Sequence, residues 1–303
     1  MTQNYFVSVI IPNYNHASYL DERLQSVLGQ TYQNFEVIIL DDCSTDYSRD
    51  VIERYRSHPK VSKIVYNEQN SGSPFKQWYK GFNLAKGELV WIAESDDSCE
   101  PTLLQRLVDC FDAYQNLSYA FCRSNYMDEN GKMGSVCQGM FPRDLHMDGR
   151  EFNHCWMMWG NKVFNASSVL MRKEYALTVN NQYMGYRGAG DWLFWIEMGE
   201  KGSVAVVADA LNHYRMYSAN TTSKARLSGE EDVEDRNIML YFKEHHYLSW
   251  LDWIRIEKKF VCSIKYWNDY ESEQVRQQSL SLWNPGPLVR LLAFISNKKR
   301  SNK

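Results

Sequence analysis

Three segments rich in polar residues follow apolar runs in the first third of the chain, and their side chains suit ligand binding. The runs cover residues 6–11, 35–40 and 89–93. In an open parallel sheet, ligands bind outside the carboxyl ends of the strands. We therefore expect the three segments to meet at one edge of a sheet. The segments are residues 12–16, 41–46 and 94–97, and two of the three carry carboxylates.

The third segment is the first candidate for a cation site, because Glu94, Asp96, Asp97 and Glu100 fall within one short loop. Like charges so close raise one another's pKa. A bound Mg²⁺ or Mn²⁺ would relieve that repulsion, since hard cations prefer oxygen ligands and commonly take one or two carboxylates plus substrate phosphates. The alternative is a solvated acidic loop that caps the helix expected near Thr102. The cluster alone supports both interpretations.

Asp41 and Asp42 form a second acidic pair, between an apolar run and a helical pattern. One carboxylate at such a place commonly caps the helix, but two adjacent carboxylates exceed what a cap needs. A carboxylate here could accept hydrogen bonds from a ribose hydroxyl or a base N–H. The turns carry neither G-x-G-x-x-G nor G-x-x-x-x-G-K-[ST], which disfavours a dinucleotide fold or a phosphate-cradling loop.

The elements that must position these residues alternate between short apolar runs and helical patterns. We predict further strands over 63–66, 166–171, 204–207 and 211–217, and helices over 19–28, 48–56, 75–85, 102–114 and 191–198. This alternation indicates an α/β fold with a mostly parallel sheet and helices on both faces. After residue 229 apolar and aromatic residues recur at helical spacing, which predicts a helical C-terminal extension.

The composition narrows the class of protein. The chain has 303 residues, 44% of them apolar, and a formal net charge of −3, which gives no electrostatic case for nucleic-acid binding. The 7 cysteines contain no C-x-x-C pair, which fits a reducing, cytoplasmic environment better than a disulfide framework. We expect neither a signal peptide nor a transmembrane helix.

A specific set of residues occurs in the order typical of one enzyme family. The set begins with residues 9–15 and 26–32, continues through residues 35–42, and ends with Tyr214 and Arg215. Its other members are Ser44, Asp46, Asn70, Gly72, Gly81, Ala85, Gly87, Glu88, Glu94, Ser95, Asp96, Asp97, Pro101, Gly190, Asp191 and Trp192. On these residues the chain resembles the family 2 glycosyltransferases, whose fold is called GT-A, from about residue 6 to residue 220.

The resemblance implies roles for individual residues. Pro12, Tyr14, Asn15 and Asp42 would form the donor site around the base. Asp96 would contact the ribose or diphosphate, and Asp97 or Asp96 would bind the metal. Lys76 is an available cation for the diphosphate. Asp191 matches the catalytic base of the family.

Three positions depart from the family pattern. Glu94 replaces the Asp that usually begins the acidic motif, and residues 77–79 replace an Ala-Arg-Asn stretch. Tyr217 stands where relatives often carry a His, two residues after Arg215. The role of that His in metal or diphosphate binding is therefore not carried over to this chain.

The implied reaction is direct displacement at the anomeric carbon, with inversion, in which Asp191 removes the proton of the attacking hydroxyl. A structural alternative is that Asp191 caps the helix that follows it. Trp192 and Trp195 would either pack on an acceptor sugar or fill the core. The resemblance favours the base, and one carboxylate can serve both purposes.

The expected organisation follows from these assignments. Residues 1–220 would form the glycosyltransferase domain, with a nucleotide-sugar half over about 1–123 and an acceptor half over about 124–220. Residues 221–303 would form the helical extension. Its end, 286–303, combines an apolar stretch with Lys298, Lys299 and Arg300, and either lies on an anionic membrane surface or docks on the protein with a solvated basic tail.

The expected function is transfer of a sugar from a UDP- or dTDP-activated donor to a hydroxyl of a glycan or lipid-linked acceptor, as in cell-surface polysaccharide synthesis. The enzyme would be cytoplasmic, and peripheral on the membrane if its end binds lipid. Two alternatives are a non-catalytic nucleotide-sugar-binding or assembly module and a nucleotidyltransferase. The latter would usually show a glycine-rich, basic loop after its first strand, and residues 12–15 are not of that kind.

Overall fold

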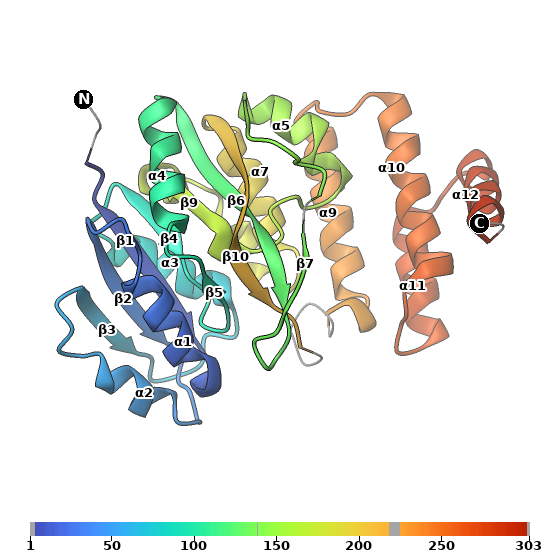
Figure 1. Cartoon of the computed structure of the whole chain (residues 1–303). Coiled ribbons are helices and arrows are strands. Elements are labelled where there is room, and N and C mark those ends of the chain that lie inside the picture. The colour runs from blue at the N-terminus through green and yellow to red at the C-terminus, as the bar shows by residue number, and fades with distance from the viewer. Residues whose placement is uncertain (1–3, 138, 218–224, 302–303) are drawn as a thin grey trace.

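A computed structural model describes residues 4–137, 139–217 and 225–301, and places ten strands in one sheet (Figure 1). The strands are β1 (Val7–Asn13), β2 (Phe35–Asp41), β3 (Val61–Tyr66), β4 (Leu89–Ile92), β5 (Ser98–Cys99), β6 (Leu117–Met127), β7 (Met133–Val136), β8 (Leu145–Met147), β9 (Val169–Arg172) and β10 (Ser203–Arg215). The sheet order is β3-β2-β1-β4-β9-β6-β10-β5, with β7 on β6 and β8 on β10.

Most of the sheet is parallel, as predicted. Strands β1, β2, β3, β4, β6 and β10 run in one direction. Strand β9 runs against its neighbours β4 and β6 and joins the two parallel halves. The carboxyl ends of β1, β2, β4 and β10 therefore lie along the same edge.

Helices cover both faces of the sheet. They are α1 (Ala17–Leu28), α2 (Ser48–Arg54), α3 (Pro74–Leu84), α4 (Leu103–Ala113), α5 (Gly149–Cys155), α6 (Lys173–Ala176) and α7 (Gly190–Gly199). Side chains alternate along each strand, so Ile10 and Ile38 face the core with α3 and α7, whereas Val9 and Val37 face α1, α2 and α4. Figure 1 shows α1 and α4 on the near face and α7 on the far face.

Two expectations for the second half are corrected. The strands predicted over 204–207 and 211–217 are one strand, β10, in which register shifts between Val207 and Asn212 absorb the polar interruption. Strand β6, at 117–127, was not predicted. Its buried residues include Ser118 and Ser124, which weaken the apolar signal that identifies a strand.

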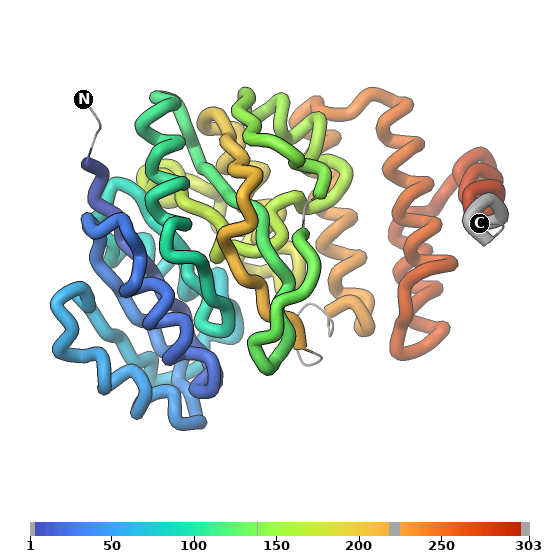
Figure 2. The backbone as a smooth tube through the Cα atoms, viewed as in Figure 1, coloured from blue at the N-terminus to red at the C-terminus, as the bar shows by residue number. Residues whose placement is uncertain are grey.

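The predicted C-terminal helical extension is confirmed. Its helices are α9 (Glu230–Glu244), α10 (Trp250–Cys262), α11 (Glu273–Trp283) and α12 (Pro287–Ser301). Figure 2 shows them at the edge of the molecule remote from β2 and β3. Ile238 and Phe242 of α9 share a continuous apolar core with Phe194 of α7. The proposed boundary at 220/221 lies outside the described residues.

No helix in the described ranges is long and apolar enough to cross a membrane.

Candidate functional site

The loops that follow β1, β2 and β4 contact one another at one edge of the sheet. Asn15 has a left-handed backbone with φ of 56°, and its N–H donates to Ser44 Oγ at 3.0 Å. His16 Nδ1 lies 2.8 Å from Ser95 Oγ. The three polar segments of the sequence are therefore neighbours in space.

Asp42 is buried and holds the loop that leads into α3. Its carboxylate accepts hydrogen bonds from the Ser71 N–H at 2.9 Å, from Asn67 Nδ2 at 2.6 Å and from Gln77 Nε2 at 2.8 Å. Asp42 thus organises the wall beside Tyr14, whose ring is 46% exposed. Any contact with a nucleobase would come from a carboxylate that is already fixed in position.

The other predicted donor residues differ in exposure. Pro12 is the next-to-last residue of the buried strand β1, and Asn15 is exposed. Lys76 is an exposed residue in the first turn of α3, and its ammonium donates to the Ser71 carbonyl at 2.9 Å. Tyr14, Asn15 and Lys76 thus border the same edge of the sheet with exposed side chains.

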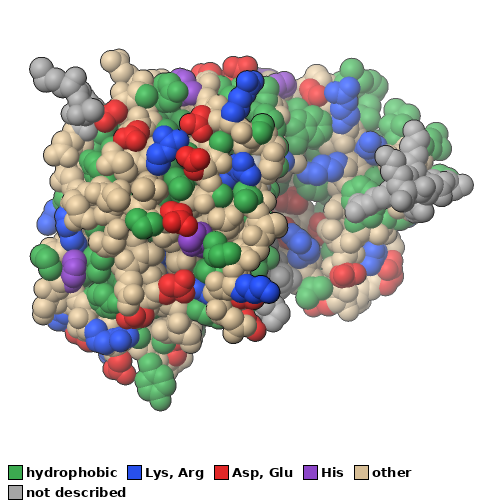
Figure 3. All heavy atoms as spheres, in the orientation of Figure 1, with side chains coloured by type: hydrophobic (Ala, Val, Ile, Leu, Met, Phe, Trp, Pro, Cys, Tyr) green, Lys and Arg blue, Asp and Glu red, His purple; other side chains and the backbone are tan. Residues whose placement is uncertain are grey.

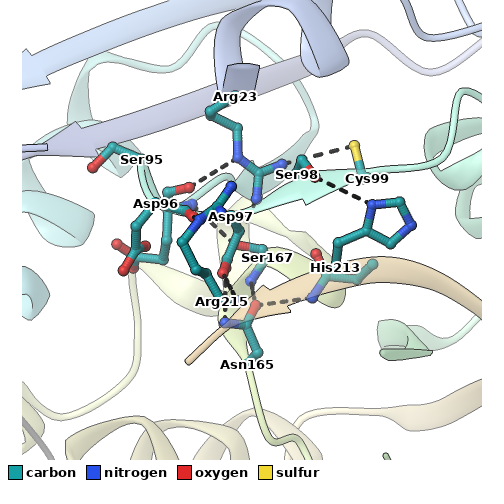
Figure 4. Close-up of polar contacts among 12 residues, drawn as sticks. Arg23, Ser95, Asp96, Asp97, Ser98, Cys99, Asn165, Ser167, His213 and Arg215 are labelled. Atoms are coloured by element: carbon teal, nitrogen blue, oxygen red, sulfur yellow. Dashed lines mark hydrogen bonds and ion pairs between the residues drawn. The ribbon is translucent and has the colours of Figure 1, made fainter. Parts of the chain in front are cut away.

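Asp97 lies at the centre of a buried polar cluster (Figure 4). Its Oδ1 accepts from the Arg215 N–H at 2.9 Å, and its Oδ2 accepts from Asn165 Nδ2 at 2.8 Å and Ser167 Oγ at 2.7 Å. The Arg23 guanidinium lies 3.8 Å from Oδ2. Both oxygens are therefore used within the protein, and direct metal binding by Asp97 remains a prediction.

Asp96 lies on the accessible side of this cluster. Its Oδ2 accepts a hydrogen bond from the Tyr217 hydroxyl at 2.9 Å, and Tyr217 Oη is 3.1 Å from His16 Nε2. A His16 tautomer protonated at Nε2 satisfies this contact and leaves Nδ1 to accept from Ser95. Tyr217 therefore joins the end of β10 to the loop after β1.

Glu94, the departure from the family motif, accepts a hydrogen bond from Trp78 Nε1 at 2.7 Å. Burial, and then the negative charge of Asp96, raise the pKa of Glu94 to about 8. Glu94 and Asp96 are thus an acidic pair whose charges act on each other. Trp78 is itself one of the residues that replace the family's Ala-Arg-Asn stretch.

No group of three or more His, Cys, Asp or Glu side chains within the described ranges is arranged to hold a metal by itself. The acidic pair of Glu94 and Asp96 nevertheless fits a divalent cation whose other ligands come from a diphosphate and water. The charge of such a cation would offset the repulsion that raises the pKa of Glu94.

Tyr214 links the acidic loop to Asp191. The pKa of the Tyr214 phenol is raised chiefly by burial, and then by the negative charges of Asp97, Asp96 and Asp191. Asp191 and Tyr214 also line one cavity of about 420 Å³. The charges of the acidic loop and of Asp191 therefore all act on Tyr214, although Asp96 and Asp97 do not line this cavity.

Asp191 lies in the first turn of α7 and is not its N-cap, which corrects the capping alternative. Helix α7 begins at Gly190, and Ala189 is the N-cap. The helix can start so close to its neighbours because residue 190 lacks a side chain: a Cβ there would lie 2.4 Å from the Phe75 ring. The side chain of Asp191 is therefore not needed as the N-cap of α7.

The Asp191 carboxylate is held by two hydrogen bonds, from Asn161 Nδ2 to Oδ2 at 2.8 Å and from the Trp192 N–H to Oδ1 at 2.8 Å. Burial raises the pKa of Asp191 to about 7, against the lowering effect of these two donors. A carboxylate with a pKa near neutrality is suited to general-base catalysis.

The two tryptophans predicted to contact an acceptor have different positions. Trp192 lines the same cavity as Asp191, and its indole N–H donates to the Met157 carbonyl at 3.0 Å. Trp195 is fully buried and packs against Trp78 and Tyr119. Trp195 is thus a core residue, the second of the two predicted alternatives: it lies one turn further along α7 than Trp192, in the part of the helix that is buried throughout.

Glu234 of α9 was not predicted as a site residue. Its carboxylate accepts hydrogen bonds from three successive backbone N–H groups that precede α7: those of Arg187 at 2.5 Å, Gly188 at 2.9 Å and Ala189 at 2.8 Å. Its charge is also one of the effects that raise the pKa of Asp191. Nothing local in the sequence distinguishes Glu234 from other acidic residues of an amphipathic helix.

Comparisons with known proteins agree with the fold. The family model "Glycosyl transferase family 2" matches residues 8–175. The chain is 28% identical over 218 residues to the putative teichuronic acid biosynthesis glycosyltransferase TuaG of Bacillus subtilis (strain 168), covering 72% of this chain and 81% of that protein. With more than half of its length matched, the chain belongs to glycosyl transferase family 2 and is a glycosyltransferase.

Solved structures share the fold. The crystal structure of S. aureus TarS 1-349 in complex with UDP-GlcNAc superposes with a TM-score of 0.60 at 22% identity, covering 92% of this chain and 71% of that one. The mannosyltransferase PcManGT from Pyrobaculum calidifontis, in complex with GDP-Man and Mn²⁺, gives a TM-score of 0.58 at 16% identity, with coverage of 98% and 81%. These likenesses establish the GT-A type of fold.

Proposed function

We propose that this chain is an inverting glycosyltransferase that moves a sugar from a UDP- or dTDP-activated donor to a hydroxyl of a glycan or lipid-linked acceptor. The observation that carries the proposal is the position of Asp191, a carboxylate with a pKa of about 7 on the wall of a cavity that it shares with Tyr214. The charges of Asp97 and Asp96 also raise the pKa of Tyr214, after the larger effect of burial. These observations support a proposal in which Asp191 is the base and the acidic loop binds the metal and the diphosphate.

In the proposed reaction, Asp191 accepts the proton of the acceptor hydroxyl as its oxygen attacks the anomeric carbon. The new glycosidic bond forms on the face opposite the departing diphosphate, whose bond to that carbon breaks with its electron pair. Attack from the opposite face inverts the configuration. Asn161 and the Trp192 N–H keep the carboxylate oriented toward the cavity.

The donor would occupy the edge formed by Pro12, Tyr14, Asn15, Asp42 and Lys76. Support comes from the position of Pro12, Tyr14, Asn15 and Asp42 at the ends of β1 and β2, and from the exposure of Tyr14. Lys76 lies in the first turn of α3. A structural relative is known in complex with UDP-GlcNAc, which favours a uridine nucleotide. Asp96 would then face the ribose or the diphosphate.

Asp96 is the proposed metal ligand. Glu94, whose charge interacts with that of Asp96, would act as a second ligand or stabilise the bound cation electrostatically. A divalent cation there supplies Lewis-acid stabilisation of the charge on the diphosphate. Asp97, bound on both oxygens, would orient the loop through Arg215 and Ser167. A structural relative is known in complex with Mn²⁺, and the same metal or Mg²⁺ is proposed here.

Cell-surface polysaccharide synthesis is the proposed setting, since one relative is named for teichuronic acid biosynthesis. The enzyme would act in the cytoplasm and bind anionic membrane through α12. That helix docks on α10 with Val289 and Ala293 buried, but leaves Leu288, Leu291 and Ile295 exposed by 50%, 56% and 41%. This apolar face is continuous in sequence with a basic end.

Turnover of activated sugars tests the proposed function. Purified protein is screened by thermal shift against UDP, dTDP, GDP and their sugars, with and without Mn²⁺, and nucleoside diphosphate release is then measured for each stabilising donor. We expect metal-dependent stabilisation and release that EDTA abolishes. Stabilisation without release, in water or with any added acceptor, would instead identify a non-catalytic binding module.

A further inference from the structure

The C-terminal extension supplies one wall of the cavity that contains Asp191. The sheet domain contributes Tyr126, Trp192 and Tyr214, and the extension contributes Asp235 from α9 and Phe260 from α10. The cavity, of about 420 Å³, is large enough for one sugar ring. Figure 3 shows a hollow between the sheet domain and the C-terminal helices, with charged side chains inside it.

Asp235 is an unusual residue in that wall. Its side chain is half-buried on the cavity wall, no hydrogen bond to it from a residue in the described part of the chain is found, and the charge of Lys259 acts on it. Most buried polar groups in proteins have such a partner. Burial, followed by the charge of Glu231, raises the pKa of Asp235 well above its ordinary value. A ligand that donates a hydrogen bond to Asp235 would therefore offset the free-energy cost of burying this carboxyl group.

The other charged groups of the cavity have partners within the protein. Arg226 and Glu231 form an ion pair at 2.8 Å. The Lys259 ammonium donates to the Trp159 carbonyl at 2.6 Å and keeps two further N–H donors. Asp191 and Asp235 keep lone pairs that can accept hydrogen bonds from a ligand, and aromatic rings complete the lining. Aromatic faces with hydrogen-bond acceptors suit a neutral, hydroxyl-rich molecule better than an anion.

Glu234, the residue before Asp235, fixes the position of Asp235 relative to Asp191. Glu234 accepts the backbone N–H groups of residues 187–189, directly before α7. Adjacent residues of a helix point about 100° apart, so Glu234 can hold the start of α7 while Asp235 faces the cavity. The position of α9 is thus tied to that of Asp191.

We propose that this cavity binds the acceptor as a neutral sugar or polyol unit, and that Asp235 accepts a hydrogen bond from a hydroxyl next to the one that reacts at Asp191. The inference rests on the proposed function, and it makes Asp235 a specificity-determining residue contributed by the extension. Glu234 is then a positioning residue.

Saturation-transfer-difference NMR tests the inference directly, with methyl β-glucopyranoside, methyl N-acetyl-β-glucosaminide and ribitol as probes. We expect at least one probe to receive saturation from the wild-type protein. The signal should fall at least threefold in Asp235→Asn and stay within error in Glu244→Gln, a matched change at the exposed end of α9. Equal signals in wild type and Asp235→Asn, or no wild-type signal from any probe, would overturn the assignment.

A second measurement avoids dependence on the folding of a variant. In the wild-type protein the bound probe should slow hydrogen exchange in α9 and at the start of α7; unchanged exchange at both would count against the cavity. Failure of the proposed function appears differently. Probe binding without any turnover of a nucleotide sugar would contradict the enzyme assignment while leaving the cavity assignment intact.

Discussion

The Tyr217 hydroxyl donates a hydrogen bond to Asp96 Oδ2 at 2.9 Å, from the position where relatives often carry a histidine. Burial, and then the charge of Asp96, raise the pKa of the Tyr217 phenol. Tyr217 is therefore a neutral donor at the acidic loop. Tyr217 orients Asp96 and also contacts His16. This residue, which follows β10, therefore connects the loop after β4 to the loop after β1.

Replacing this hydroxyl should impair catalysis without unfolding the protein. For Tyr217→Phe we expect kcat/KM for the donor to fall about tenfold, because a hydrogen bond to a charged group contributes about 1.5–3 kcal/mol. Tyr217→His, which restores the residue common in relatives, should retain more activity than Tyr217→Phe. Identical steady-state kinetics for wild type and Tyr217→Phe would remove Tyr217 from the site.

Asp42 should affect both donor binding and stability. In Asp42→Asn we expect the Kd for the free nucleotide, titrated by calorimetry, to rise about tenfold, which corresponds to about 1.4 kcal/mol. The melting temperature should also fall, because Asn67, Ser71 and Gln77 lose a charged acceptor. Gln77→Ala is the control: it loosens the same loop but keeps the carboxylate. An equal rise in Kd for both variants would show that Asp42 acts only through the loop.

The pH dependence of transfer should report Asp191. A base must be ionised to accept a proton, and burial raises the pKa of Asp191 to about 7. We expect kcat/KM to fall about tenfold per pH unit below that value and to level off above it. The free energy of unfolding should change in the opposite direction. Because the folded state favours the protonated form of Asp191, the stabilisation from this group is present at acid pH and is lost as the pH rises through about 7. A kcat/KM profile that stays flat down to pH 5 would contradict the assignment.

Much of the donor edge follows from the sequence, since strand ends and their polar residues are local features. The runs before Pro12, Asp42 and Glu94 are buried and apolar, so their parallel pairing brings the loops together. The roles of Glu234 and Asp235 could not be predicted. They depend on α9 packing against α7, some 40 residues away in sequence, and no local pattern encodes that contact.

The same limit explains why the sequence allowed a capping alternative for Asp191 and why it divided β10 in two. Asp191 was a reasonable N-cap by residue type, but the helix starts earlier because Gly190 permits close contact with Phe75. Strand β10 continues through Ala208 and Asp209, because pairing with β6 tolerates shifts in register. In both cases tertiary contacts decide the boundary of the element.

Binding to membrane should depend on the exposed apolar face of α12. We expect the protein to co-sediment with vesicles that contain phosphatidylglycerol, and the bound fraction to fall at least by half in the double variant Leu288→Ser, Leu291→Ser. Val289→Ala, on the buried face, is the control and should bind as wild type does. Equal sedimentation of the double variant and wild type would favour a helix that only docks on the protein.

The most direct test of the account is the rate of sugar transfer by Asp191→Asn, measured beside wild type and the exposed control Glu174→Gln. The amide keeps the shape of the side chain but cannot accept the proton. We predict a rate loss of about 10²–10⁴-fold, with the Kd for the nucleotide unchanged within about twofold. A variant that keeps most of the wild-type rate, with the nucleotide bound normally, would show that Asp191 is not the base.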